Sequence, residues 1–274
     1  MLKDIRLHLE KDNTKQEKLE KKLAEHIAVT QRKNINSFQR NIPSILPYVE
    51  SPKLQNYALF CNKFGEFNIV DYGTGRTFYG LHPEREIEAQ VNKYCQRCPY
   101  IDLSADVSYK QDVDTDSVTE LEALPSYQQL MKQDPLPNQV ECLVLLGCGI
   151  GTHIPILLQR LKIKYLVIYE PEPQYFQCSS LVADWQHIFD YAKQNGIGMF
   201  IQLEKDGRDI VNDIEELRFH EGIAGFHLFQ HYNHPVFDSL YRDLTTRSWQ
   251  DIKSNGINFQ FSKHHNEYVT TWTA

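Results

Sequence analysis

The stretch LVLLGCGIGTH, residues 143–153, decides the fold, because it predicts a buried strand, a glycine-rich turn and the start of a helix. The continuous apolar run over 142–146 is typical of a strand that is covered on both faces. Gly147, Gly149 and Gly151 permit a tight turn, a close approach of the backbone to a ligand, and close helix–strand packing. The backbone amides at the start of the following helix are then available to an anionic or hydrogen-bonding group.

Beyond this turn, short apolar runs alternate with helical patterns along the chain. The patterns predict further strands over 165–169, 198–203 and 224–229, and helices that end near 161 or span 173–182, 185–194 and 209–219. Strands that recur between helices imply a parallel sheet with crossover connections. We therefore predict a Rossmann-like α/β domain with a mostly parallel sheet.

The segment before this domain has a different pattern. Its first thirty residues have apolar positions at helical spacing with a break at Asn13-Thr14, and Asn34 or Asn36 is expected to cap a further short helix that Pro43 limits. Short alternating runs between glycine turns over 54–80 predict a small antiparallel β-meander.

Two prolines indicate where this first module ends. Pro135 and Pro137 follow a polar, acidic stretch over 104–119 that we expect to be an exposed loop. The predicted organisation is an α+β N-terminal module over 1–135 and the Rossmann-like domain over 136–274.

Composition excludes several classes of protein. The chain has 274 residues, with 29 Lys and Arg against 36 Asp and Glu and a formal net charge of −7, which is unfavourable for a nonspecific nucleic-acid binder. It has no apolar signal segment at its start and no uncharged run near the roughly 20 apolar residues that span a bilayer. Six cysteines are too sparse for a disulfide scaffold. We expect a cytoplasmic protein with no membrane or nucleic-acid partner.

A carboxylate is expected beside the glycine turn. The G-x-G-x-G spacing differs from the dinucleotide fingerprint G-x-G-x-x-G and resembles the first motif of class I methyltransferases that use S-adenosylmethionine. Those enzymes place an acidic residue at the end of the next strand to bind ribose hydroxyls, and Glu170 stands there. Gly147, Gly149, Gly151 and Glu170 are thus candidates for binding a nucleoside-type ligand, S-adenosylmethionine or a CMP-sugar. The alternative is that the glycines serve backbone geometry alone.

Two further residues are candidates for the same site. His153 lies in the first turn of the helix, where the helix dipole favours the neutral imidazole, and it either donates to a ligand or is a plain helix residue. Asp206 follows the third strand of the domain and either contacts a base or sugar or caps a helix. We assign no catalytic residue.

No metal centre is expected. Cys95-x-x-Cys98 has no second cysteine pair, and His227, His231 and His234 are loosely spaced around a strand end. These histidines are expected to line the carboxyl end of the fourth strand, where open α/β sheets place their sites.

Longer runs of this sequence resemble the Maf proteins, the motility-associated factors that glycosylate flagellin with nonulosonic acids. The resemblance lies in LVLLGCGIGTHIPILLQRLKIKYLVIYEPEPQYF at 143–176, with its Gly-x-Gly-x-His turn and its strand ending in Glu170-Pro171. It extends upstream to NINSFQRNIPSI and NYALFCNKFGEFNIVDYGTGRTFYG, and downstream to His234-Pro235-Val236-Phe237.

This resemblance implies a function that the chain serves only in part. In the Maf family the sugar transfer takes place in a following domain, related to sialyltransferases and to 6-hydroxymethylpterin pyrophosphokinases (MptE-like). We therefore expect this chain to be the N-terminal part of a glycosyltransferase whose catalytic centre follows Ala274. Flagellin or another protein acceptor would be its partner through the parent protein. The sequence also allows an oligomer. The other two hypotheses are a methyltransferase-like or other nucleoside-binding enzyme, and an interaction module with an empty Rossmann-like fold.

Overall fold

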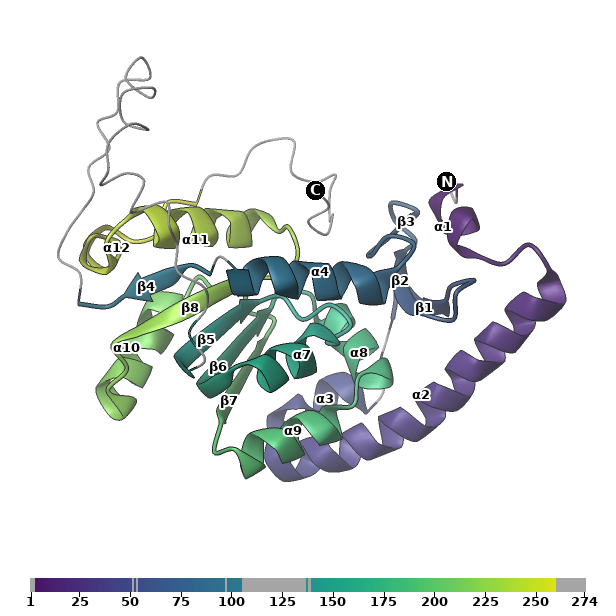
Figure 1. The fold of residues 1–274 in the computed structure, drawn as a ribbon, viewed down its shortest axis with the longest axis horizontal. Helices are drawn as coiled ribbons and strands as arrows, with labels where there is room; N and C mark the ends of the chain where they lie inside the picture. The colour runs from purple at the N-terminus through teal and green to yellow at the C-terminus, as the bar shows by residue number, and fades with distance from the viewer. Residues whose placement is uncertain are drawn as a thin grey trace, which may run out of the picture.

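A five-stranded sheet with the order β4-β8-β5-β6-β7 forms the centre of the molecule (Figure 1). In this computed structural model the parallel strands are β5 (Gln139–Leu146), β6 (Lys162–Glu170), β7 (Gly198–Leu203) and β8 (Gly225–Gln230). The edge strand β4 (Tyr100–Asp102) pairs antiparallel with β8. The predicted mostly parallel α/β sheet is confirmed. β4 was not predicted, because three residues are too few to show an alternating pattern.

The structure describes residues 3–50, 52, 54–96, 98–104, 137 and 139–259. The predicted loop over 104–119 lies outside this part of the chain after its first residue, as does the boundary at residue 135. The division into units 1–135 and 136–274 stays a prediction.

Helices cover both faces of the central sheet. On one face lie α4 (Pro83–Gln96), α7 (His153–Arg160) and α9 (Trp185–Gln194), and on the other α10 (Ile210–Glu221), α11 (Pro235–Thr246) and α12 (Trp249–Asn255). β5 packs against the helices on both faces of the sheet, because successive side chains of a strand point to opposite faces. Leu143 and Leu145 pack with the first group of helices, and Val144 and Leu146 with the second.

A second, smaller sheet lies beyond the carboxyl edge of the first. β1 (Tyr57–Cys61), β2 (Phe67–Asp71) and β3 (Arg76–Thr77) form an antiparallel meander, which confirms the prediction for this segment. Phe78 and Tyr79 follow β3 and are buried in the same core as Tyr175 of α8 (Pro173–Val182). The meander is therefore packed onto the larger unit by aromatic side chains.

The helical part of the N-terminal segment differs from the prediction. A short α1 (Lys3–His8) precedes a single 29-residue helix, α2 (Asn13–Asn41), whose N-cap is Asp12. The prediction of a separate helix capped by Asn34 or Asn36 is wrong. Asn34 is buried inside α2, where its side-chain amide donates to the carbonyls of Ser180 and Ala183, at 2.7 Å each. Its polar side chain thus serves a tertiary contact in place of a cap.

α2 runs along α8 and α9 and joins their core (Figure 1). The buried ring of Phe38 lies 5.7 to 5.8 Å from the rings of Phe176, Trp185 and Phe189. After α2 the chain turns through a 3-10 helix (Pro43–Ile45) and α3 (Leu46–Val49), which contribute Ile45 and Val49 to the same cluster. The N-terminal segment and the Rossmann-like unit therefore share one core.

No helix in the described part of the chain has both the length and the apolar character needed to cross a bilayer.

The contact of Asn34 with α8 gives a direct test of this shared core. Asn34→Ala leaves two buried carbonyls without their donor, so we expect the free energy of unfolding to fall by about 2 kcal/mol. Asn36→Ala is the matched control, because Asn36 lies exposed on the same helix and alanine is the better helix former. Urea denaturation of both variants measures the difference. Equal effects would show that Asn34 does not hold the two parts together.

Candidate functional site

The glycine turn lies at the carboxyl edge of the central sheet, between β5 and α7. The N–H of Gly147 donates to the Tyr169 carbonyl at 2.8 Å, and the N–H of His231 donates to the Leu146 carbonyl at 2.9 Å. The turn thus lies between the ends of β6 and β8, the two neighbours of β5. This is the topological switch point at which open α/β sheets bind ligands.

All three glycines adopt positive φ angles, which are 98°, 51° and 79° for Gly147, Gly149 and Gly151. A Cβ added to any of them would clash with a neighbouring side chain: the Tyr232 ring at Gly147, the Tyr79 hydroxyl at Gly149, and Ser179 Oγ at Gly151. The close approach that the sequence predicted at Gly149 is here made by side chains of the protein itself.

Glu170 faces the turn and is fully buried. Its Oε2 accepts from the N–H of Cys148 at 2.7 Å, and its Oε1 accepts from the N–H of Glu172 at 3.0 Å and from the Tyr232 hydroxyl at 2.5 Å. Burial raises the pKa of Glu170 to about 7, although these donors act in the opposite direction. The carboxylate is where the sequence predicted it, and the protein's own donors occupy both of its oxygens.

A second network reaches the turn from the N-terminal segment. The N–H of Ile150 donates to the Tyr79 hydroxyl at 3.3 Å, and this hydroxyl lies 2.8 Å from His231 Nε2. On the other side of the ring, His231 Nδ1 lies 2.8 Å from Oε1 of Gln90 in α4, whose amide donates back to the His231 carbonyl at 2.7 Å.

These partners define the protonation of His231. Because Oε1 of Gln90 can only accept, the ring proton of His231 lies on Nδ1, and Nε2 then accepts from the Tyr79 hydroxyl. Burial lowers the pKa of His231 to about 3, so the ring is neutral. The turn is therefore bonded to the meander and to α4 through an uncharged chain of hydrogen bonds.

His153 lies in the first turn of α7 and is fully buried. Its ring stacks on that of His231 at 3.9 Å and on that of Phe229 at 5.6 Å. Both ring nitrogens lack a hydrogen-bond partner in the described part of the chain. Burial, followed by the neighbouring His231, holds the pKa of His153 well below its usual range. The neutral form expected from the helix dipole is present, with burial as the main cause.

Asp206 takes no part in these networks within the described residues. It pairs with Arg208 at 2.9 Å, and α10 has Asp209 at its N-cap position. The expected contact of Asp206 with a base or sugar stays a prediction.

The structure separates the three histidines around the end of β8. His227 lies with its Nδ1 3.3 Å from Cys98 Sγ, His231 bonds to Tyr79, and His234 packs on the ring of Phe237. Within the described residues, no three His, Cys, Asp or Glu side chains lie together as ligands for a metal ion.

Comparison with known proteins identifies the family. Residues 31–250 match the family described as the glycosyltransferase Maf N-terminal domain. The chain belongs to this family. The resemblance to Maf proteins is thereby confirmed.

A solved structure shares the Maf fold. The Maf glycosyltransferase from Magnetospirillum magneticum AMB-1 superposes with a TM-score of 0.57 at 19% sequence identity, over 85% of this chain and 36% of that one. At this identity the likeness shows the fold alone. The chain spans about a third of the length of that protein. No curated protein sequence matches the chain.

In this Maf N-terminal domain, the sequence did not reveal Tyr79, Gln90 and Tyr232 as residues of the site. Tyr79 and Gln90 come from a segment far upstream of the turn. Tyr232 follows the fourth strand of the domain, where the sequence predicts only histidines at the border of the site. The position of Tyr232 just beyond the carboxyl end of the fourth strand was the available indication, because such positions border the switch point.

The filled space at Gly149 leads to a stability prediction. Gly149→Ala meets both the positive φ and the nearby Tyr79 and His231 atoms, and we expect it to lower the free energy of unfolding by about 2–5 kcal/mol. Gly196→Ala is the control, because Gly196 also has a positive φ, of 67°, with no atom within 4 Å of an added Cβ. It should cost only about 1 kcal/mol. Equal losses in urea denaturation would contradict the close packing at the turn.

The raised pKa of Glu170 predicts a pH dependence. From its ordinary value of 4.5 up to about 7, the folded protein holds a proton on Glu170 that the unfolded chain releases. Folding stability from this group is therefore lost as the pH rises through this window, by up to about 3 kcal/mol. Glu170→Gln cannot titrate, so the stability of the wild type minus that of the variant should fall between pH 4.5 and 7. Urea denaturation across this range measures it, and a constant or rising difference is the contrary result.

Proposed function

We propose that this chain is the N-terminal region of a Maf-type glycosyltransferase that acts in the cytoplasm in flagellin glycosylation and motility. In this proposal the chain is not catalytic by itself and serves acceptor recognition or domain assembly. The MptE-like catalytic domain lies elsewhere in the parent protein and binds the sugar donor. Two findings support the proposal: the family match over 31–250, and the longer chain of the Magnetospirillum magneticum protein that shares this fold.

The observation that carries the non-catalytic role is the occupied carboxylate of Glu170. A nucleoside-binding enzyme of this kind needs an acidic side chain open to ribose hydroxyls. Here the carboxylate is fully buried and accepts from Cys148, Glu172 and Tyr232. A ribose would have to displace the Tyr232 hydroxyl and enter a space that the Tyr232 ring fills against Gly147. These contacts favour a structural role for the glycine turn.

The alternative is a methyltransferase-like or other nucleoside-binding enzyme. It is favoured by the position of the turn at the switch point and by the carboxylate at the end of β6. In that case Tyr232 and Tyr79 would have to move away from the turn when the ligand binds.

Ligand-dependent thermal unfolding separates the two proposals. We expect no change in Tm when S-adenosylmethionine, S-adenosylhomocysteine, CMP or a CMP-linked sugar is added to the 274-residue chain. A ligand bound at 100 times its Kd contributes about 2.7 kcal/mol, which would raise the Tm by about 5 to 10 °C. The physical reason for the null result is that Glu170 already has its hydrogen-bond donors.

Two controls make the result decisive. A rise in Tm that is lost in Glu170→Ala would overturn the non-catalytic proposal in favour of the alternative. Incubation of the chain with flagellin and the CMP-linked sugar should leave the flagellin mass unchanged in mass spectrometry. A mass increase equal to the sugar would place catalysis inside this chain.

A further inference from the structure

In the described part of the chain, β7 is an edge strand without the charged residues or proline that usually protect such a strand. Within the described residues β7 ends the sheet and pairs only with β6, residue by residue from Tyr165 and Gly198 to Glu170 and Leu203. Its sequence, GMFIQL, contains no charged residue and no proline. Natural proteins blunt a free edge with such residues, because unpaired N–H and C=O groups bind other strands.

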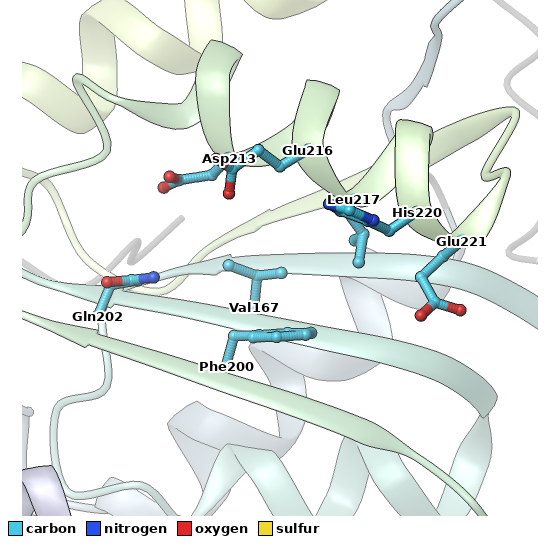
Figure 2. Close-up of a pocket in the computed structure, with 8 residues that line it drawn as sticks. All are labelled: Val167, Phe200, Gln202, Asp213, Glu216, Leu217, His220 and Glu221. Carbon is cyan, nitrogen blue, oxygen red and sulfur yellow. The ribbon is translucent and has the colours of Figure 1, made fainter.

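A groove lies along one face of this edge, between β7 and α10. It encloses about 190 Å³, with Val167, Phe200 and Leu217 as its apolar walls (Figure 2). Phe200 points into the groove and is 43% exposed, a large fraction for an aromatic side chain in a strand. The apolar surface thus continues directly from the edge strand.

Carboxylates surround this groove. Asp213, Glu216 and Glu221 of α10 line it together with Gln202 and His220 (Figure 2). Asp213 accepts from the Tyr169 hydroxyl at 2.6 Å, and Glu221 accepts from the Tyr165 hydroxyl. Among the described residues, the lining of the groove contains these three carboxylates and no Lys or Arg, so the groove favours a cationic side chain.

A second groove lies on the opposite face of the same strand, against α9 and the end of α2. It encloses about 250 Å³, and its lining includes the apolar residues Ile42, Phe189, Ala192, Ile197 and Met199, beside Asn41 and Lys193. Because side chains alternate between faces along a strand, Phe200 and Met199 border different grooves. A strand added beside β7 would place its alternate side chains over the two grooves in turn.

We propose that the edge of β7 and its two grooves form a docking site for an extended segment of a partner protein, with Lys or Arg at alternate positions and apolar residues between them. The main chain of the segment would pair with β7. Its basic side chains would enter the groove of Asp213, Glu216 and Glu221, and its apolar side chains the groove of Met199 and Phe189. This site is distinct from the glycine turn and does not depend on the function proposed above.

Charge argues against a second copy of the chain as the occupant. Antiparallel pairing of two β7 strands about a twofold axis would place both α10 helices on the same face of the joined sheet. The two sets of carboxylates, Asp213, Glu216 and Glu221, would then face one another, and like charges at an interface are unfavourable. A basic segment removes this repulsion.

A synthetic peptide tests the proposal. Fluorescein-labelled KVKVKVKV, acetylated and amidated, should bind the 274-residue chain saturably in fluorescence anisotropy and slow hydrogen exchange of the β7 amides. Glu216→Lys should weaken binding by at least about tenfold, because it reverses a charge at the groove. Glu17→Lys, the same charge change at an exposed position of α2, should leave the affinity unchanged.

Four outcomes would overturn the proposal. If Glu17→Lys weakened the binding as much as Glu216→Lys, the binding would depend on the net charge of the protein alone. Equal affinity for EVEVEVEV would show that the carboxylates do not select a basic segment. Equal affinity for KVKVKVKV with N-methylated valines would show that the segment does not pair with β7 through main-chain hydrogen bonds. A dimer in sedimentation that Phe200→Lys dissociates would make a second copy the occupant. Because Glu216 and Glu17 are exposed, circular dichroism should show that both variants stay folded.

Discussion

The structure depends on the hydrogen bonds that Glu170 accepts at the glycine turn. A buried carboxylate is costly unless donors surround it, and here the Cys148 amide, the Glu172 amide and the Tyr232 hydroxyl supply them. The same bonds fix the turn, because the amide of Cys148 would otherwise be buried without an acceptor. Glu170 thus accepts from an amide of the turn that could otherwise bind an anionic or hydrogen-bonding group of a ligand.

Hydrogen bonds at the carboxyl edge of the sheet also join the N-terminal segment to the sheet. Tyr79 brings its hydroxyl to Ile150 and His231, and Gln90 holds the other side of the His231 ring. Low pKa values of the two stacked histidines follow from the burial that this packing produces. Asn34 and Phe38 of α2 make a second connection, to α8 and α9. The meander and α2 therefore pack into the same hydrophobic clusters as the Rossmann-like sheet and its helices.

The helices and strands could be predicted from local sequence patterns, whereas the surroundings of the glycine turn depend on contacts between residues far apart in the sequence. The helices Pro173–Val182 and Trp185–Gln194 and the strand Gly198–Leu203 match the predicted ranges, because their apolar periods and flanking residues are local properties. The prediction of a helix cap at Asn34 was wrong for the opposite reason. A cap and a buried tertiary contact both require a polar side chain, so the local sequence does not distinguish them. The positions of Glu170 and the glycines were predictable, and the partners that fill their surroundings were not.

The glycine motif shows why a sequence pattern of this kind is ambiguous in function. A glycine that admits a ligand and a glycine that admits a tyrosine hydroxyl meet the same steric requirement, since both need an absent Cβ and a positive φ. At Gly149 the deciding atom belongs to Tyr79, in another part of the chain. If the turn is structural, the carboxyl edge of this sheet is no longer available for recognition. Contacts with other proteins must then use other surfaces, and the free edge of β7 is the surface where main-chain hydrogen-bonding groups, apolar side chains and charge coincide.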